Sequence, residues 1–186
     1  MFIIKDNYYL YIENTRNIDL NYIKNRKKIS IIYRNNNIQE NKKDLCAFRK
    51  KCKVKGFKLY ISNDIKILRD CNADGLYLSS YNKKIYLNKR INLIGSAHSY
   101  KEINEKIKQG CKTIFLSRLF ETSYKDKKNY LGIMKFNIIS SKYKVKIVPL
   151  GGIRSSNLNK LKLINSSGLA LLSEVKKKPV ITNRLF

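Results

Sequence analysis

Residues 145–153 read VKIVPLGGI, an apolar run that predicts a buried strand ending at two glycines. A second apolar run, Gly168–Leu172, ends at a small polar residue, Ser173. In a parallel barrel the loops after two neighbouring strands bring their backbone N–H groups together, where they can bind a phosphate. The sequence therefore predicts that Gly151, Gly152 and Ser173 form a phosphate site after the last two strands.

Apolar runs that predict strands alternate along the chain with helical patterns. The predicted strands are Tyr8–Ile12, Ile29–Tyr33, Lys58–Ile61, Gly75–Leu78, Leu93–Ser96, Thr113–Ser117, Lys146–Leu150 and Gly168–Leu172. The predicted helices are Asp19–Arg26, Asn41–Lys53, Asp64–Asn72, Ser99–Gln109, Gly132–Lys142 and Asn157–Ile164. This alternation predicts an α/β fold, a compact (β/α)8 TIM barrel that occupies residues 1–186 as a single domain.

The chain has 186 residues, fewer than the roughly 200 that a TIM barrel usually needs. The segment Ser79–Arg90 is polar and has no helical pattern, and little chain remains after Pro179. We therefore expect trimmed helices after strand 4 and strand 8. No Gly-x-Gly-x-x-Gly follows the first strand, which argues against a dinucleotide-binding fold.

The sequence has 40 Lys and Arg against 13 Asp and Glu, for a formal net charge of +27. A charge of this size is typical of proteins that bind nucleic acid. Here the cations are spread along the whole chain, and no RNA-binding motif interleaves them with aromatic residues. We interpret the charge as a solvated surface, with a nucleic-acid binder as the alternative.

The four cysteines, Cys46, Cys52, Cys71 and Cys111, include no Cys-x-x-Cys pair, and the chain has one His, which argues against a zinc site. We interpret all four as reduced core residues of a cytoplasmic protein. The N-terminus has no signal-peptide pattern, and no window approaches the ~20 apolar residues of a membrane span. We expect no membrane partner.

The chemistry of a TIM barrel takes place at the carboxyl ends of its strands, and polar residues follow most strands here. They include Arg34, Ser62, Asn63, Asp64, Ser79, Ser96, His98, Glu121, Thr122 and Lys125. His98, the one imidazole, is a candidate general acid or base; a surface position beside the helix cap Ser99 is the alternative. Asp64 is interpreted first as a helix cap. Arg34 and Lys125 are candidate ligand-binding cations or two more surface charges.

Five short stretches in order along the chain resemble the thiamine-phosphate synthase/TenI superfamily of small TIM barrels. They are ADGLYL at 73–78, IGSAHS at 94–99, LFET at 119–122 with Lys125 and Leu131-Gly132, PLGGI at 149–153, and GLALLS at 168–173. Two activities are known in this superfamily. Thiamine-phosphate synthase joins a pyrimidine diphosphate to a thiazole phosphate with the help of Mg²⁺. TenI-type members bind the same thiazole phosphate, and some aromatise a thiazole tautomer by proton transfer.

The resemblance implies a thiamine-biosynthesis protein whose partner is a small phosphorylated substrate. It implies that Gly151, Gly152 and Ser173 hold the thiazole phosphate and that His98 moves a proton. It also implies that the ligand is contacted by Asn63, Ser96, Thr122 and Lys125. If a diphosphate binds, the resemblance implies that Arg34 holds it. The oligomeric state stays open, a homo-oligomer included.

The residues at the positions where the family binds its metal ion depart from the family pattern. The family's Asn-Asp pair after strand 3 appears as Ser62-Asn63 or, shifted by one, as Asn63-Asp64, and the second metal carboxylate falls near Asn82. Asp64 alone would be a poor Mg²⁺ site, because hard cations need several anionic oxygens. We expect Mg²⁺ as a cofactor only if the protein is a synthase, and we favour a TenI-like thiazole tautomerase. A synthase with a weakened metal site and a non-catalytic binding barrel are the alternatives.

Overall fold

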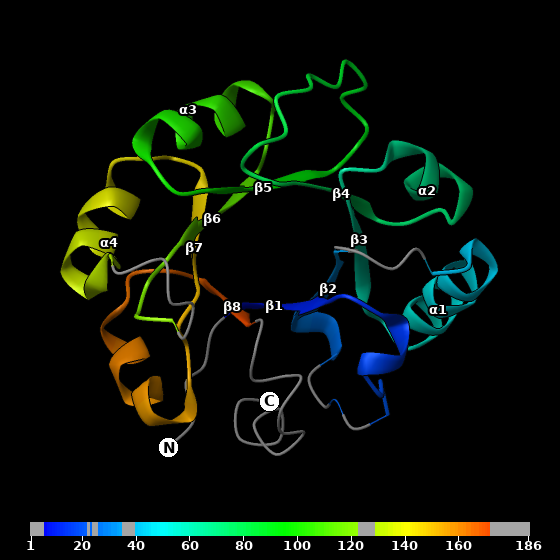
Figure 1. Cartoon of the computed structure of the whole chain (residues 1–186), viewed down its shortest axis with the longest axis horizontal. Coiled ribbons are helices and arrows are strands. Elements are labelled where there is room, and N and C mark those ends of the chain that lie inside the picture. The colour runs from blue at the N-terminus through cyan, green and yellow to red at the C-terminus, as the bar shows by residue number, and fades with distance from the viewer. Residues whose placement is uncertain (1–5, 22, 24–25, 35–39, 123–128, 172–186) are drawn as a thin grey trace.

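The chain folds into one closed barrel of eight parallel strands with helices on its outside, as the computed structural model shows (Figure 1). The structure describes residues 6–21, 23, 26–34, 40–122 and 129–171. The strands are β1 Asn7–Ile12, β2 Ile29–Tyr33, β3 Lys58–Ser62, β4 Gly75–Leu78, β5 Leu93–Ala97, β6 Thr113–Ser117, β7 Lys146–Leu150 and β8 Gly168–Leu171. Each strand pairs in parallel with the next, and β8 closes on β1 with Asn7 opposite Gly168. The predicted TIM barrel is confirmed.

In the part of the chain that the structure describes, four α-helices cover the barrel: α1 Lys42–Val54, α2 Ile65–Asp70, α3 Tyr100–Lys108 and α4 Gly132–Ser141. Three of them begin at a side-chain cap that accepts a backbone N–H: Asn41 before α1, Asp64 before α2 and Ser99 before α3. All four lie close to the predicted ranges. Among the described residues no helix is long and apolar enough to cross a membrane.

The connections after β1 and β7 differ from the prediction. The described residues of Asp19–Arg26 form no α-helix; the 3-10 turns η1 Thr15–Asn17 and η2 Arg26–Lys28 flank them. After β7 the predicted helix is the 3-10 helix η3, Ser155–Leu163. The spacing of apolar residues in a short segment does not distinguish an α-helix from a 3-10 helix, because contacts between residues i and i+3 occur in both. The connection after β4 has no helix, as predicted, and the one after β8 lies outside the described residues.

Side chains fill the barrel interior from every strand. The inner cluster consists of Tyr9, Tyr11, Ile32, Tyr60, Tyr77, Ile94, Phe115, Val148 and Ala170. Strand residues between these positions point outward and pack under the helices, as Leu10, Leu59 and Ile114 do. The interior is thus aromatic where barrels of this kind more often use branched aliphatic residues. Four tyrosines inside the barrel mean that four hydroxyl groups must find partners there.

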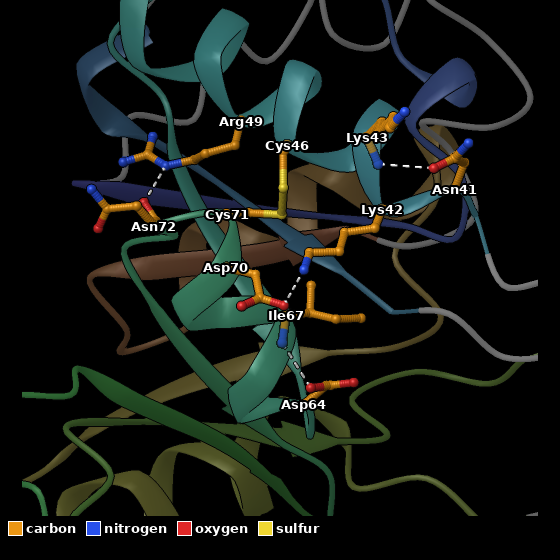
Figure 2. Close-up of a disulfide and its surroundings, with 10 residues drawn as sticks. All are labelled: Asn41, Lys42, Lys43, Cys46, Arg49, Asp64, Ile67, Asp70, Cys71 and Asn72. Carbon is orange, nitrogen blue, oxygen red and sulfur yellow. Dashed lines mark hydrogen bonds and ion pairs between the residues drawn. A yellow bond between two sulfur atoms is a disulfide. The ribbon is translucent and has the colours of Figure 1, made fainter.

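Two of the cysteines form a disulfide, so the expectation that all four are reduced is wrong. Cys46 on α1 is bonded to Cys71 at the end of α2, with the Cα atoms 4.7 Å apart (Figure 2). The bond joins neighbouring helices of the barrel surface, a proximity that depends on the closed fold and not on local sequence. Cys52 and Cys111 are free and buried, and burial raises the pKa of each thiol to about 12.

We expect reduction of this disulfide to destabilise the protein. The cysteines are 25 residues apart, and loop-closure entropy gives the cross-link about 3.5 kcal/mol of stabilisation. Denaturant unfolding with and without reductant measures the difference. A variant with Cys46→Ser and Cys71→Ser should match the reduced wild type and should not respond to reductant. Equal stability of oxidised and reduced wild type would contradict the prediction.

Candidate active site

The polar side chains predicted to form the barrel mouth follow the carboxyl ends of neighbouring strands. Because the barrel is closed and parallel, all these ends lie on one rim. Arg34 follows β2, Asn63 follows β3, Ser96 and His98 lie at the end of β5, and the Gly151-Gly152 pair follows β7. Ser96 is almost fully buried, and Arg34 and Asn63 are half-buried.

Asn63 is the centre of a neutral hydrogen-bond network that joins the loops after β3 and β4. Its Oδ1 accepts hydrogen bonds from the backbone N–H of Ser79 (3.0 Å) and from Nδ2 of Asn82 (2.9 Å). Its Nδ2 donates to Oγ of Ser79 (2.9 Å) and to the hydroxyl of Tyr81 (3.2 Å). Asn63 has a left-handed backbone, φ 57°, which Asn tolerates better than most residues. This rim segment is held together by amides and hydroxyls.

Asp64 caps the helix after this network. Its Oδ1 accepts the backbone N–H of Ile67 at 2.9 Å, in the first turn of α2 (Figure 2). This is the capping role that the sequence favoured for it. Among the described residues, no group of three or more His, Cys, Asp or Glu side chains is placed to share a metal ion.

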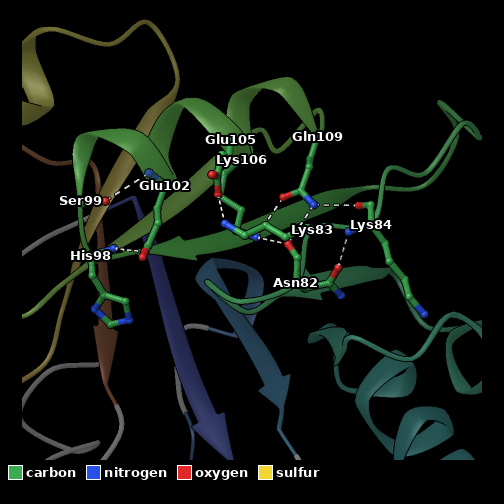
Figure 3. Close-up of polar contacts among 9 residues, drawn as sticks. All are labelled: Asn82, Lys83, Lys84, His98, Ser99, Glu102, Glu105, Lys106 and Gln109. Carbon is green, nitrogen blue, oxygen red and sulfur yellow. Dashed lines mark hydrogen bonds and ion pairs between the residues drawn. The ribbon is translucent and has the colours of Figure 1, made fainter.

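The loop after β4 is fastened to α3 in place of a helix of its own. Nζ of Lys106 donates to the backbone carbonyl of Asn82 (2.7 Å), and Nε2 of Gln109 donates to the carbonyls of Asn82 (3.0 Å) and Lys84 (2.8 Å) (Figure 3). Lys106 also donates to Oε1 of Gln109, and Lys83 pairs with Glu105. Burial lowers the pKa of Lys106. These contacts position Asn82 beside Asn63.

His98 stands at the end of β5, where its ring contacts β6. Its Nδ1 lies 2.8 Å from Oγ of Ser117, and its backbone N–H donates to Oε2 of Glu102 (2.7 Å). Figure 3 shows the ring projecting away from the start of α3. Ser99 accepts the N–H of Glu102, so the predicted capping box forms with its return bond shifted to His98. The ring is therefore held through Nδ1.

The glycines after β7 form a turn that only glycine fits. Both have positive φ, 95° at Gly151 and 71° at Gly152. A Cβ on Gly152 would lie 2.3 Å from the carbonyl oxygen of Phe120, which belongs to the loop after β6. Asn157 fixes the turn, since its Nδ2 donates to the carbonyl of Gly152 (2.8 Å) and its Oδ1 accepts the N–H of Arg154 (2.9 Å). Gly151 and Gly152 thus form a tight turn, held by Asn157, at the carboxyl end of β7.

Of the other predicted site residues, Thr122 lies within the described residues. Thr122 is half-buried, and its Oγ1 accepts a hydrogen bond of 3.4 Å from Nη1 of Arg118. The Arg118 side chain also lies against Gly151. Lys125 and Ser173 lie outside the described residues.

Sequence reasoning missed several polar partners at this rim. Ser117 was counted only as the end of a strand, although residues of β5 and β6 that face inward must alternate with period two. Since Phe115 points into the barrel, Ser117 does so as well, and the exposed His98, just past the end of β5, reaches it there. Applying the alternation to both strands would have brought the pair together.

The match to a known family covers most of the chain. Residues 12–175 match the family model described as thiamine monophosphate synthase. The chain belongs to this family. The thiamine-phosphate synthase of Prochlorococcus marinus AS9601 is 30% identical over 123 residues, which are 63% of this chain and 35% of that protein. The synthase of Clostridium perfringens SM101 is 26% identical over 183 residues, 91% of this chain and 88% of the relative.

A solved structure has the same fold as this chain. The thiamine phosphate pyrophosphorylase of Pyrococcus furiosus superposes with a TM-score of 0.74 at 17% identity, covering 96% of this chain and 91% of that chain. The chain spans only about a third of the length of the Prochlorococcus relatives that it matches. The family therefore establishes ancestry and fold, and the activity is a matter for proposal.

Proposed function

We propose that this barrel is a thiamine-biosynthesis enzyme that binds a thiazole phosphate at its mouth and transfers a proton without Mg²⁺, as a thiazole tautomerase does. The observation that carries the proposal is the contact between Oδ1 of Asn63 and Nδ2 of Asn82. At this part of the rim the sequence resemblance would put metal-binding carboxylates. Two neutral amides occupy it and share one hydrogen bond, and their other polar atoms are bonded to Ser79, Tyr81 and Lys84.

The residues at this part of the rim do not fit Mg²⁺. The ion prefers octahedral oxygen coordination that includes carboxylates. Oδ1 of Asn63 already accepts two hydrogen bonds from Ser79 and Asn82, and Oδ1 of Asp64 caps α2. Coordinating Mg²⁺ would break these bonds without bringing a cluster of carboxylates to the ion. We derive no catalytic step through a metal.

His98 is the proton-transfer group of the proposal. The contact with Ser117 holds its Nδ1. If Ser117 donates to Nδ1, the proton of a neutral ring sits on Nε2; if Nδ1–H donates to Ser117, Nε2 is the basic nitrogen. In the second form Nε2 takes a proton from one atom of the bound ring, which gives an imidazolium, and returns it to another atom of the ring, while Nδ1–H donates to the serine hydroxyl throughout.

The remaining residues at the rim bind the ligand in this proposal. Gly151 and Gly152, with Ser173, hold the phosphate; Ser96, Asn63, Thr122 and Lys125 contact the ligand; Arg34 supplies a further cation. Support for the phosphate end comes from the positive φ angles of the two glycines and from the bond between Asn157 and Gly152. A phosphate there would also lie near the Arg118 side chain, which packs against Gly151.

The second candidate is a thiamine-phosphate synthase that works with a weakened metal site. It is favoured by the relatives, since the matched proteins of Prochlorococcus and Clostridium are described as thiamine-phosphate synthases. A non-catalytic barrel that binds the same ligand is the third. All three bind the same ligand, so the reaction that each catalyses, or the lack of one, distinguishes them.

The deciding experiment gives purified protein two sets of substrates. One is the thiazole tautomer phosphate, whose aromatisation is followed spectroscopically; the other is thiazole phosphate, pyrimidine diphosphate and Mg²⁺, assayed for thiamine phosphate. We expect aromatisation that persists in EDTA and no thiamine phosphate. Mg²⁺-dependent thiamine phosphate formation would establish the synthase instead. Retained binding with neither reaction would establish the non-catalytic barrel.

We expect His98→Ala to lower the aromatisation rate at least about 100-fold, because it removes the only imidazole and its proton transfer. Ligand affinity should change little. Ser117→Ala is the matched variant: it keeps the imidazole but releases Nδ1, so the rate should fall less than in His98→Ala. Steady-state kinetics across pH measures both. An unchanged rate for His98→Ala would remove His98 from the mechanism.

A further inference from the structure

The cations are spread along the chain, but the fold gathers many of them at one end of the barrel. In a closed parallel barrel all strands begin at the same end, which lies opposite the mouth and is called here the amino-end face. Seven exposed cations of the described residues lie within three residues of a strand start: Lys27, Lys28, Lys58, Arg90, Lys112, Lys144 and Lys146. They precede or begin β2, β3, β5, β6 and β7, so they surround most of this face.

Carboxylates do little to neutralise the amino-end face. Asp6 precedes β1, and Asp74 precedes β4, where its carboxylate is already bonded to Nη2 of Arg49. Among the described residues, none of the seven cations is in an ion pair. Carboxylates are found instead where strands end, at the mouth: Glu13 after β1, Asp64 after β3 and Glu121 after β6. An anion therefore meets its most favourable field at the amino-end face.

The helix dipole does not account for these positions. The carboxyl end of a helix favours cations, which explains Lys53 in the last turn of α1 and Lys108 at the end of α3. The effect fades beyond the last turn, whereas Lys112 and Lys146 stand at the starts of two paired strands, with Thr113 opposite Lys146. Like charges gathered on one face repel each other in the free protein, and a bound anion relieves that repulsion.

A polar cavity lies at the same face, between the end of α2 and the segment before β5. Its volume is 310 Å³, and its polar lining comes from Arg69, Asn72, Asp74, Asn88, Arg90 and Asn92. A guanidinium group binds phosphate through two parallel N–H bonds, and amide groups donate to phosphate and sugar oxygens. The carboxylate of Asp74 does not oppose this, because Arg49 already pairs with it. The cavity thus offers donors that suit a phosphate group.

We propose that the amino-end face binds the phosphate backbone of a nucleic acid without reading its sequence, and that the cavity between Arg69 and Arg90 holds one of the phosphates. Six of the seven strand-start cations are lysines, which act on phosphates as point charges and carry no preference for a base. An anionic lipid surface would also need an apolar face that inserts. Val54 and Leu163 are single exposed apolar residues at the ends of separate elements, α1 and η3. The mouth stays free, so this inference does not depend on the proposed function.

The first test measures the fluorescence anisotropy of a labelled DNA duplex of about 20 base pairs, titrated with wild-type protein at several salt concentrations. We expect the logarithm of the affinity to fall linearly with the logarithm of the salt concentration, with a slope of about −4 or steeper, as for four or more contacted phosphates. A duplex of unrelated sequence should bind equally well, and thiazole phosphate should displace neither. A wild type that binds no duplex, or a duplex displaced by thiazole phosphate, would overturn the inference.

The second test reverses three charges of the amino-end face, in a variant with Lys112→Glu, Lys144→Glu and Lys146→Glu. We expect the affinity for the duplex at low salt to fall at least about 100-fold and the salt slope to become shallower by about 3, because three phosphate contacts are lost. The milder variant with glutamine at the same three positions should lose at least about tenfold. Arg69→Gln with Arg90→Gln should also weaken binding about tenfold, since the cavity then lacks both guanidinium groups.

The matched control reverses the same number of charges at the other end of the helices, with Lys43→Glu, Lys101→Glu and Lys135→Glu. These exposed residues lie in the first turns of α1, α3 and α4, where a carboxylate is favourable for the helix. The control has the same net charge as the first variant and should lose less than about tenfold in affinity. Equal losses in both variants would show that the charge acts diffusely and would overturn the inference. Thermal unfolding verifies that the variants fold.

Anionic vesicles identify the class of partner. Vesicles of phosphatidylcholine with about a quarter phosphatidylserine carry surface charge without a nucleic-acid backbone. We expect the wild type to bind the duplex more tightly than these vesicles at the same salt concentration. Tighter binding to the vesicles, lost in the variant with the three reversed charges at the amino-end face, would assign this face to a membrane and overturn the inference.

Discussion

Replacing Asp74 by alanine is expected to lower the free energy of unfolding by about 1.5 to 3 kcal/mol, because the buried Arg49 loses a charge-assisted hydrogen bond and keeps the one to the carbonyl of Asn72. Asp74 Oδ1 accepts a charge-assisted hydrogen bond from Nη2 of Arg49 at 2.9 Å, and its Oδ2 accepts the backbone N–H of Leu59 at 2.7 Å. The Arg49 residue is 8% exposed. One carboxylate therefore joins α1 to β3 at the amino ends of the strands.

The control for this variant is Asp70→Ala. Asp70 also forms an ion pair with a residue of α1, but its partner Lys42 is largely exposed. Exposed pairs contribute roughly 1 kcal/mol or less, so this variant should unfold almost as the wild type does. Urea unfolding monitored by circular dichroism compares the three proteins. Equal losses for Asp70→Ala and Asp74→Ala would contradict the special role of the carboxylate that pairs with the buried Arg49.

Gly152→Ala is expected to have the largest effect at the mouth. Alanine at φ 71° is strained by about 1 to 2 kcal/mol. Its Cβ would also meet backbone atoms, the carbonyl oxygens of Phe120 at 2.3 Å and of Glu121 at 2.6 Å, so one of the two loops must move. Together these effects should cost about 3 kcal/mol or more of stability. The affinity for thiazole phosphate should fall by at least about tenfold, because the turn no longer fits the phosphate.

Gly110→Ala is the control that shows the effect of backbone strain without a steric clash of the new Cβ. Gly110 follows α3 with φ 85°, and a Cβ there would meet no atom within 4 Å. The variant should lose only the strain of about 1 to 2 kcal/mol and should bind the ligand as before. Titration calorimetry and thermal unfolding on both variants make the comparison. Normal ligand affinity in Gly152→Ala would show that the phosphate binds elsewhere.

The sequence was sufficient for the barrel because its signals are local. Each strand is a short apolar run, and the caps Asn41, Asp64 and Ser99 stand directly before their helices. The segment Asp19–Arg26 shows the limit of this approach. It had a capping aspartate and two apolar residues, and tertiary packing arranged its described part without an α-helix. The helix propensity of a short segment is small, so packing against the rest of the protein decides its conformation.

The site was harder to predict, because its main contacts join residues far apart in the chain. The contact between His98 and Ser117 spans 19 residues, as does the one between Asn63 and Asn82. Reading strand ends in order placed His98 and Asn63 on the rim but could not assign partners. The same limit applies to Cys46 and Cys71, whose bond depends on how two helices pack. The role of Asp74 was also hidden, because a charge before a strand reads the same whether it binds a ligand or a buried arginine.

The most direct test of the account is a titration of the wild-type protein with thiazole phosphate, once in EDTA and once in excess Mg²⁺. If the Gly151-Gly152 turn holds the phosphate and the amides of Asn63 and Asn82 stay bonded to each other, the ligand should bind with the same affinity in both solutions. The heat of binding should show no linked uptake of metal. Binding that requires Mg²⁺, or that tightens severalfold with it, would contradict the account and would mean that this mouth assembles a metal site after all.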